Sequence, residues 1–380
     1  MPMWVEALEH AVEKTRRNIN KFGDFFPWTG LDGGDYKRSD HQDWTEGFWS
    51  GLLWLSYEAS GDPVFREAAV RTVHSFRRRL ETFKVLDHHD IGFLYLPSAV
   101  AWWMLEGEEE ARELGLAAAD TLLKRWRPAG GYIQAWGPAG DPKNGGRIII
   151  DCLLNLPLLY WAYEQTGDPS YLEVALAHAE KSRRYLVRGD DSSYHTFYFN
   201  QENGEPVGGG THQGYHDGST WTRGQAWGIY GFMLSYKYTK NRVYLEASRR
   251  MAAYFIAHLP EDQVTYWDFD VPIGEGTPRD SSATAIACCG MLELVGCLPE
   301  SDPDRERFEH AVFRCMKSLT ENYLTTDDLD AEGLLRHGSY HVRGGMSPDD
   351  FVIWGDYFYM EALMRLVRGV PGYWYERALR

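Results

Sequence analysis

Two aspartates stand at the start of long apolar stretches, where a charged side chain is costly unless it has a function. Asp151 lies inside the run from Ile148 to Trp161, and Asp90 begins a similar run that continues to Trp103. Burial among apolar side chains disfavours the ionised form of a carboxyl group and raises its pKa. A carboxylic acid that keeps its proton can act as a general acid, and an ionised neighbour can stabilise developing positive charge. The two aspartates, at the heads of two apolar helices, therefore predict one shared cleft.

Histidines and glycines with polar neighbours lie in the long segments between the apolar runs. His195 and His212 stand among Ser, Thr, Gln and Gly, so a hydrogen-bonding or charge-stabilising role is at least as plausible as core packing. The run from Gly208 to Gly210 is rich enough in glycine for a phosphate-binding loop, but neither a strand pattern before it nor Gly-Lys-Ser/Thr after it supports that function. Its composition favours close approach of backbone N–H groups to a ligand carboxylate instead.

The His pair before Asp90 does not predict a metal site. His88 and His89 are flanked by Asp87 and Asp90, which are all possible ligands. Adjacent residues on a helix, however, point about 100° apart and cannot easily chelate one ion. We therefore expect neither a metal ion nor another cofactor.

Aromatic residues are abundant, with 15 Trp and 23 Tyr. Because aromatic rings stack on the apolar faces of sugars, this composition suggests a carbohydrate cleft. Trp44, Trp136, Trp221 and Trp227 lie at expected helix starts or in loops, where sugar stacking is as plausible as core packing. Arg223, one turn into the helix expected after Trp221, would face the cavity and suits bidentate recognition of a carboxylate.

Helical periodicity organises the chain, and strand alternation is scarce. Apolar and amphipathic segments alternate, joined by related turns such as Gly61-Asp62-Pro63 and Gly167-Asp168-Pro169. This is an internal repeat of a helical hairpin. Six apolar inner helices, each followed by an amphipathic helix that runs back, predict a single all-α (α/α)6 toroid over residues 1–380, closed by packing of the last apolar helix on the N-terminal one. The expected helices are roughly 3–21, 46–59, 63–82, 91–106, 108–126, 150–166, 169–187, 221–239, 241–258, 281–297, 302–322 and 354–368.

An acid precedes or heads each expected inner helix, which places the six helix starts at one end of the toroid. For four of these acids a capping or structural role is at least as plausible as a catalytic one: Asp43, Asp217, Asp280 and Asp356. Asp90 and Asp151 differ because each lies directly against its apolar run and is followed by a Pro, which can kink the helix and tilt its head toward the cavity. The long connections, roughly 127–149, 188–220, 259–280 and 323–353, are expected at the same end.

Bulk composition excludes several kinds of partner. A net charge of −16 argues against nucleic acid and anionic membranes, which require a basic face. The sequence shows neither an N-terminal leader pattern nor an apolar stretch of membrane-spanning length, so we expect a cytoplasmic protein. The five Cys, without a CxxC pair, are expected to be reduced core thiols.

Five motifs, in the same order, resemble those of the unsaturated glucuronyl hydrolases, glycoside hydrolase family 88. The resemblance extends from about Lys21 to Arg377, nearly the whole chain. Its strongest stretches are Asp43–Gly51, Leu86–Phe93, Gly145–Asp151, Asp191–Thr196 and Trp221–Trp227.

The resemblance implies the (α/α)6 fold and removal of the 4,5-unsaturated uronic acid that polysaccharide lyases leave at a non-reducing end. The expected substrates are thus unsaturated disaccharides and oligosaccharides from glycosaminoglycans or bacterial polysaccharides. Asp151 matches the family's general acid/base and Asp90, rather than the nearby Asp87, its second catalytic carboxylate. Residues implied to bind or surround the substrate are Trp44, Trp136, His195, Gly209, Thr211, His212, Gln213, Arg223 and Trp227. The late loop His341–Pro348 lacks the Ser/Lys-rich element of members that favour sulfated fragments, which favours unsulfated substrates.

Three other functions remain open from the sequence. A related hydrolase family acts on unsaturated rhamnogalacturonan. Isomerases similar to N-acylglucosamine 2-epimerase share the toroid but move a proton with histidines, which would make His195 and His212 essential and Asp151 a cap. A non-catalytic helical scaffold would leave the buried acids and the aromatic residues without a purpose.

Overall fold

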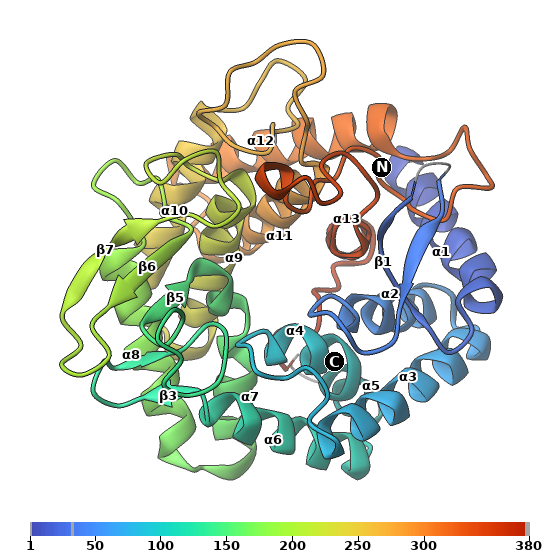
Figure 1. Ribbon diagram of the computed structural model, residues 1–380. Coiled ribbons are helices and arrows are strands. Elements are labelled where there is room, and N and C mark those ends of the chain that lie inside the picture. Colours follow the sequence, from blue (N-terminus) through green and yellow to red (C-terminus); the bar gives the residue numbers. More distant parts are fainter. Residues whose placement is uncertain (1, 32–33, 377–380) are drawn as a thin grey trace.

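The computed structural model describes residues 2–31 and 34–376, whose helices form two concentric rings (Figure 1). Each inner helix contacts the next, and the last returns to the first, so the ring closes. The predicted (α/α)6 toroid is confirmed. Of the predicted range 1–380, Met1 and residues 32–33 and 377–380 lie outside the described residues. The inner ring consists of α2 (Gly47–Ser60), α4 (Ile91–Tyr95) continued by η1 (Leu96–Val100) and α5 (Ala101–Glu106), α7 (Leu156–Thr166), α9 (Thr222–Thr239), α11 (Ser281–Cys297) and α13 (Ile353–Arg368).

The outer ring is amphipathic, and its helices begin at the repeated turns. Asp62, Asp168, Asn241 and Asp302 each accept a backbone N–H bond two residues on, which satisfies a free donor at the helix start. As predicted, the N-terminal helix packs on the last inner helix. The outer helices are α1 (Pro2–Phe22), α3 (Pro63–Glu81), α6 (Glu109–Leu123), α8 (Pro169–Tyr185), α10 (Arg242–Ala257) and α12 (Pro303–Ser318), the last continued by η3 (Leu319–Tyr323).

Two inner helices are irregular near their starts, as the prolines predict. Pro97 lies in the π-helical turn η1, between α4 and α5. The other apolar run begins with the 3-10 turn η2 (Ile150–Leu154) before α7, which has Pro157 in its first turn. Asp90 precedes α4 directly, and Asp151 lies in the first turn of η2. Neither aspartate caps its helix with its side chain, so both carboxyl groups remain available for other contacts.

Short strands, which the sequence analysis did not predict, connect the helices at the end where the inner helices begin. The sheet β5 (Arg147–Ile149), β6 (Thr196–Phe199) and β7 (Pro206–Gly210) is antiparallel and pairs Ile149 with Thr196, and Thr196 with Gly210. This register brings His195 and the segment after Gly210 close to Asp151. The other strands are β1 (Phe26–Gly30), β2 (Tyr36–Ser39), β3 (Trp126–Arg127) and β4 (Tyr132–Ile133); the late loop holds the 3-10 turn η4 (Val342–Gly344).

The four acids expected to have capping or structural roles are structural in different ways. Asp280 caps α11 by accepting the backbone N–H of Ala283. Asp356 accepts hydrogen bonds from two backbone N–H groups and from the Tyr36 hydroxyl, and thereby fixes the strand β2 to the late part of the chain. Asp217 accepts the N–H of Thr211, and Asp43 that of Thr45. Only Asp280 among these four therefore acts as a helix cap.

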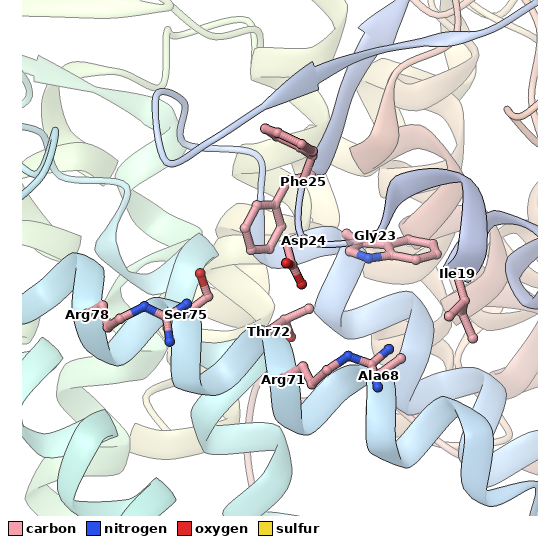
Figure 2. Close-up of a pocket in the computed structure, with 11 residues that line it drawn as sticks. Ile19, Gly23, Asp24, Phe25, Ala68, Arg71, Thr72, Ser75 and Arg78 are labelled. Carbon is pink, nitrogen blue, oxygen red and sulfur yellow. The ribbon is translucent and has the colours of Figure 1, made fainter.

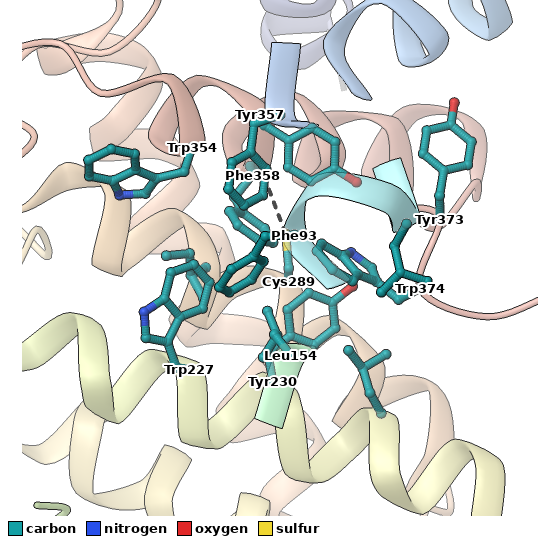
Figure 3. Packing of buried hydrophobic residues seen from close by; sticks show 14 of the residues in the cluster. Phe93, Leu154, Trp227, Tyr230, Cys289, Trp354, Tyr357, Phe358, Tyr373 and Trp374 are labelled. Atoms are coloured by element: carbon teal, nitrogen blue, oxygen red, sulfur yellow. Dashed lines mark hydrogen bonds between the residues drawn. The ribbon is translucent and has the colours of Figure 1, made fainter. Parts of the chain in front are cut away.

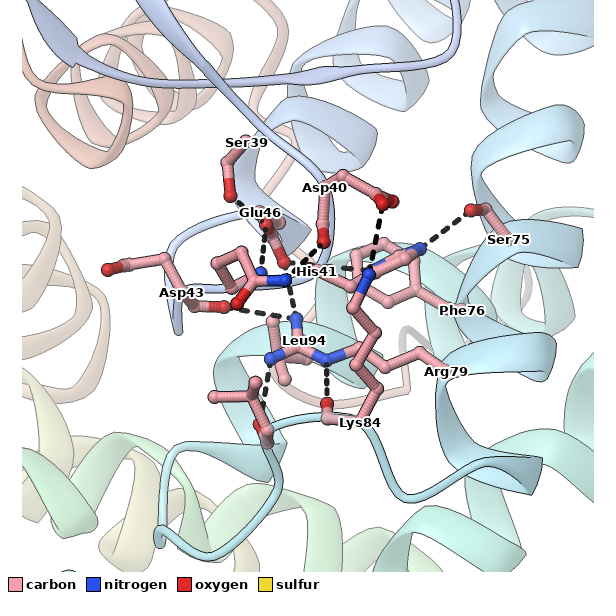
Figure 4. A network of polar contacts seen from close by, with 12 residues as sticks. Ser39, Asp40, His41, Asp43, Glu46, Ser75, Phe76, Arg79, Lys84 and Leu94 are labelled. Atoms are coloured by element: carbon pink, nitrogen blue, oxygen red, sulfur yellow. Dashed lines mark hydrogen bonds and ion pairs between the residues drawn. The ribbon is translucent and has the colours of Figure 1, made fainter.

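A buried ion pair joins the start of α2 to the end of α3 (Figure 4). The side chains of Glu46 and Arg79 are both 0% exposed and contact each other directly. Glu46 also accepts a hydrogen bond from Ser39, and Arg79 donates to the backbone oxygen of Asp43 at 3.0 Å. Because Arg79 binds both Asp43 and Glu46, which flank Trp44 in the chain, the pair holds the segment that carries Trp44.

Within residues 2–31 and 34–376, none of the helices combines the length and apolarity needed to cross a bilayer.

We predict that Glu46→Gln lowers the free energy of unfolding by about 3–5 kcal/mol, because it leaves the Arg79 charge buried without a counter-ion. Urea denaturation followed by circular dichroism measures the change. The matched control is Glu321→Gln, which breaks the exposed pair of Glu321 with Lys317 and should cost less than about 1 kcal/mol. Equal losses in the two variants would contradict the structural role assigned to the buried pair.

Candidate active site

A cavity of about 200 Å³ opens among the starts of the inner helices and the long connections. It contains six of the predicted site residues, among them both catalytic candidates. The lining consists of Trp44, His89, Asp90, Trp136, Ile149, Asp151, His212, Gln213, Tyr340, His341 and Met346. The predicted shared cleft for Asp90 and Asp151 is therefore present.

Asp151 is held in its neutral form. Its side chain is 13% exposed, and its Oδ2 atom has no hydrogen-bond partner among the described residues. Burial, followed by repulsion from Asp90, raises the pKa of Asp151 to about 8, although Arg223 and the Trp227 indole act in the opposite direction. A carboxyl group with such a pKa carries a proton near neutral pH and can donate it.

Asp90 has the opposite electrostatic environment. His89 Nε2 lies 3.3 Å from its Oδ1 atom, and His88 Nδ1 lies 3.5 Å from its Oδ2 atom. Burial would raise the pKa of Asp90, but the two histidines and Arg125 outweigh it and hold that pKa below its ordinary value. The cavity therefore pairs an ionised Asp90 with a protonated Asp151.

Asn155, which the sequence analysis missed, connects the two acids. Its Nδ2 atom lies 3.4 Å from Asp90 Oδ1 and 3.2 Å from the backbone oxygen of Asp151, while its Oδ1 atom accepts the N–H of Phe93. A Cβ atom at Gly92 would overlap Asn155, so the glycine allows this close approach. A lone amide one turn after Asp151 in an apolar run was the sequence signal for this contact.

His195 is a neutral imidazole with a defined tautomer. Its Nδ1 atom accepts the backbone N–H groups of His212 and Gln213, both at 3.1 Å, so the ring proton must reside on Nε2. Burial, reinforced by His212 and Arg223, lowers the pKa of His195 well below its ordinary value. The Nε2 atom lies 3.8 Å from Asp151 Oδ2, and it has no other partner within the described chain. His195 thus presents an N–H group at the acid.

Trp44 and Trp136 contribute aromatic rings to the cavity wall. Trp44 donates its indole N–H to the Tyr340 hydroxyl at 3.1 Å, which fixes both rings. Trp136 meets the His212 ring edge-on at 5.0 Å, and the Arg147 guanidinium lies 5.0 Å from the Trp136 centroid. Tyr340, together with its neighbour His341, was not singled out as a site residue because the late loop carries no periodic pattern.

Arg223 is partly engaged by other residues. Nη1 binds Asp280 at 2.6 Å and the backbone oxygen of Ser339, and Nη2 donates one hydrogen bond, to the backbone oxygen of Tyr340 at 2.7 Å. The guanidinium is fully buried between the rings of Trp221 and Trp354. Nε has no hydrogen-bond partner among the described residues, so bidentate recognition of a carboxylate by Arg223 stays a prediction. The bonds from Nη1 and Nη2 also position the loop that carries Tyr340.

Three more predicted residues lie behind the cavity lining. Trp227 is completely buried, on the helix α9 that packs against η2. Thr211 places its hydroxyl 3.3 Å from His195 Nδ1 and accepts the N–H of Gly214. A Cβ atom at Gly209 would overlap the Tyr194 ring, so this glycine is needed for packing of the sheet. These residues shape the site without forming its surface.

Other pockets lack this chemistry. Figure 2 shows a pocket of about 40 Å³ between the end of α1 and α3, with Asp24, Arg71 and Arg78 around it. A cavity of about 380 Å³ at the opposite end of α7 and α9 has Glu164 as its carboxyl group and several tyrosines. Neither combines an ionised with a neutral carboxyl group. No cluster of three or more His, Cys, Asp or Glu side chains suited to a metal ion occurs in the described part of the chain.

Comparisons with known proteins agree with this geometry. The model of the family described as Glycosyl Hydrolase Family 88 matches residues 26–367. The chain is 62% identical over 375 residues to an unsaturated glucuronyl hydrolase of Bacillus sp. strain GL1, covering 99% of this chain and 100% of that protein. The crystal structure of unsaturated glucuronyl hydrolase from Bacillus sp. GL1 gives a TM-score of 0.97 over the same shares of the two chains, at 62% identity. An unsaturated chondroitin disaccharide hydrolase of Streptococcus agalactiae is 46% identical, over 97% of this chain and 92% of its own length.

The raised pKa of Asp151 predicts a pH-dependent stability difference. The unfolded chain releases this proton near pH 3.9, whereas the native protein keeps it up to about pH 8. Between these values the native state binds more protons than the unfolded state. The free energy of unfolding of the wild type therefore falls by about 1.4 kcal/mol for each unit that the pH rises. Asp151→Asn should therefore become increasingly more stable than the wild type from pH 4 to pH 8, with no further gain above pH 8.

Urea denaturation at half-unit pH intervals measures this difference. Asp90→Asn is the control, and its effect on the free energy of unfolding should change with pH in the opposite direction. An acid with a lowered pKa stabilises the native state when it is ionised. Parallel pH dependences for the wild type and Asp151→Asn would show that Asp151 titrates normally.

Proposed function

This chain belongs to glycosyl hydrolase family 88, and from that premise we propose that it removes a 4,5-unsaturated glucuronic acid from the non-reducing end of lyase-generated oligosaccharides. The observation that carries the proposal is the pair of carboxyl groups in one cavity, where burial raises the pKa of Asp151 and the neighbours of Asp90 lower the pKa of that acid. A C4=C5 double bond next to the ring oxygen is a vinyl ether, which reacts by taking up a proton. A neutral acid in the cavity wall is suited to deliver it.

The reaction begins with proton transfer from Asp151 to C4. Positive charge then develops at C5 and the ring oxygen, where the ionised Asp90 stabilises it. Asp151, now a carboxylate, takes a proton from the water that adds to C5. The resulting hemiketal opens to a ketone at C5, and the hemiacetal left at C1 expels the partner sugar. Asp151 ends the cycle protonated, so the acid acts first as donor and then as acceptor.

Substrate binding is assigned to the residues around this pair. Trp44 and Trp136 offer aromatic faces for sugar rings, and His212 and Gln213 offer polar groups from the cavity wall. His195 directs its Nε2–H group toward Asp151 and can donate to the substrate. Arg147, beside Trp136, supplies positive charge for the substrate carboxylate. Gly209, Thr211, Arg223 and Trp227 hold these groups in place.

The choice among substrates follows the relatives and the late loop. One relative is named for unsaturated chondroitin disaccharides, and the solved Bacillus protein is described as responsible for the degradation of glycosaminoglycan. We extend that substrate class to this chain. The segment His341–Pro348 contributes His341 and Met346 to the cavity and carries Arg343 as its charged residue, and this composition favours unsulfated disaccharides.

The isomerase alternative is disfavoured by the state of the histidines. That reaction requires histidines that exchange protons near neutral pH. Burial lowers the pKa of His212 to about 4 and holds that of His195 well below its ordinary value, and two backbone N–H groups occupy the Nδ1 atom of His195. Neither ring is suited to carry a proton through a reaction cycle.

We also propose that the whole chain works as one catalytic unit in the cytoplasm. The catalytic pair, the aromatic wall and the closing helix α13 come from all parts of the sequence, which supports the single unit. The five cysteines are free, and four of them are buried, which suits a reducing compartment. Recovery of the activity from a secreted or periplasmic fraction would contradict the location.

The function is tested by the loss of ultraviolet absorbance of the C4=C5 bond when the purified protein is mixed with unsaturated disaccharides. Unsulfated and sulfated chondroitin, hyaluronan and rhamnogalacturonan disaccharides form the panel. We expect turnover of glucuronyl substrates, with unsulfated disaccharides preferred. Asp151→Asn and Asp90→Asn should each lower kcat by about 10²–10⁴-fold or more, because the acid or the charge stabilisation is lost.

Asp87→Asn is the matched control, since Asp87 flanks the same histidine pair but is 58% exposed and does not line the cavity. It should retain nearly the wild-type rate. Turnover by Asp151→Asn at the wild-type rate would refute the assigned acid, and preference for rhamnogalacturonan fragments would refute the substrate class.

A further inference from the structure

The end of the described chain fills the part of the inner ring opposite the cavity. Residues 371–376 follow α13, and Gly372, Tyr373 and Trp374 are buried. Figure 3 shows Tyr373 and Trp374 among the inner aromatic residues. The segment is therefore part of the interior of the toroid.

Side chains and one backbone oxygen of this segment bind all six inner units. Trp374 donates its indole N–H to Glu361 of α13 at 2.8 Å and accepts, at its backbone oxygen, the hydroxyl of Tyr238 of α9 at 3.0 Å. A Cβ atom at Gly372 would overlap the Glu361 carboxylate, so glycine is required for this approach. The remaining bonds join Tyr373 to Glu58 of α2 (2.7 Å), Tyr375 to Glu293 of α11 (2.6 Å), and Glu376 to Trp103 of α5 (3.0 Å) and Trp161 of α7 (3.1 Å).

A continuous set of ring contacts leads from this segment to the catalytic acid. Trp374 stacks on Phe358 with centroids 5.7 Å apart and planes inclined by 4°, and meets Phe93 edge-on at 6.3 Å. Phe358 and Phe93 in turn contact the Trp227 ring at 5.4 and 5.1 Å. These four rings lie together in Figure 3.

Trp227 is the end of this path and borders Asp151. Its indole N–H has no hydrogen-bond partner that meets ordinary geometry within the described residues, yet it acts on Asp151 and lowers its pKa. Phe93 also contacts Trp44 of the cavity wall at 5.3 Å, and its backbone N–H binds Asn155. Movement of Phe93 or Phe358 would therefore change the surroundings of both catalytic acids.

We propose that Trp374 is a positioning residue of the active site: by filling the far end of the inner ring it holds Phe93 and Phe358 against Trp227 and so keeps the Trp227 indole beside Asp151. The proposal rests on the function proposed above for its kinetic consequence. Other titratable or charged groups around Asp151 are Asp90, His195, Arg223, Cys152 and, across the cavity, His212 and His341. No hydrogen bond or ring contact joins any of these to Trp374 in the part of the chain that the structure describes.

Three variants separate positioning from simple stabilisation. Trp374→Ala removes the ring, Trp374→Phe keeps an aromatic ring on Phe358 but loses the bond to Glu361, and Glu376→Ala loses anchoring bonds without touching the ring path.

The readout is the pH dependence of kcat on unsaturated disaccharide. The alkaline fall, which reports loss of the Asp151 proton, should move to higher pH in Trp374→Ala and kcat should decrease more than KM changes. Trp374→Phe and Glu376→Ala should keep the wild-type pH profile, even with a lower Tm.

A substrate-free measurement makes the proposal independent of the activity. The stability difference produced by Asp151→Asn should stop growing at a higher pH in the Trp374→Ala background than in the wild type. A folded Trp374→Ala protein in which this limit is unchanged would overturn the positioning role, as would an equal change in Glu376→Ala. If the wild type leaves every disaccharide intact, but this pH limit still moves upward in the Trp374→Ala background, the proposed function is refuted and the positioning role remains supported.

Discussion

The repulsion between Asp90 and Asp151, inside a cavity that excludes most water, is the interaction on which the site depends. Burial alone raises the pKa of both acids, so their difference must come from their neighbours. Two histidines lie next to Asp90, which also experiences the positive charge of Arg125. Asp151 lies instead in an apolar turn next to the neutral imidazole of His195. Two identical side chains thereby acquire the separate roles of charge stabiliser and proton donor. The sheet β5-β6-β7 and Asn155 maintain this asymmetry by fixing the neighbours.

The toroid explains how one ring of helices can serve both catalysis and stability. Irregular turns at Pro97 and before Pro157 occur at the end where the inner helices begin. There the side chains of Asp90 and Asp151 do not cap a helix and line the cavity instead. At the opposite end, buried acids such as Glu361 and Glu293 are fully paired with Arg365 and hold residues 371–376. Asp151 Oδ2 and His195 Nε2 thus remain unpaired at the catalytic end, where a substrate can satisfy them.

Much of the fold could be predicted because its helices carry strong periodic patterns and repeated turn residues. The twelve expected segments correspond to the helices of the described chain, and the acid pair stood out against its apolar context. The short strands could not be predicted, since Arg147–Ile149 is too short to show alternation and Gly208–Gly210 lacks side chains. The engagement of Arg223 by Asp280, and the contacts of Asn155 and Tyr340, depend on residues far apart in sequence. Local composition cannot encode such contacts.

The most direct test of the account is a ¹³C NMR titration of the Asp151 side-chain carboxyl carbon in aspartate-labelled protein, with its signal identified by its absence in Asp151→Asn. The account predicts that this carbon titrates near pH 8 and that Asp90→Asn lowers the midpoint, because the repelling charge is gone. A midpoint near pH 4, unaffected by Asp90→Asn, would show an ordinary ionised carboxylate and would contradict Asp151 as the resting proton donor.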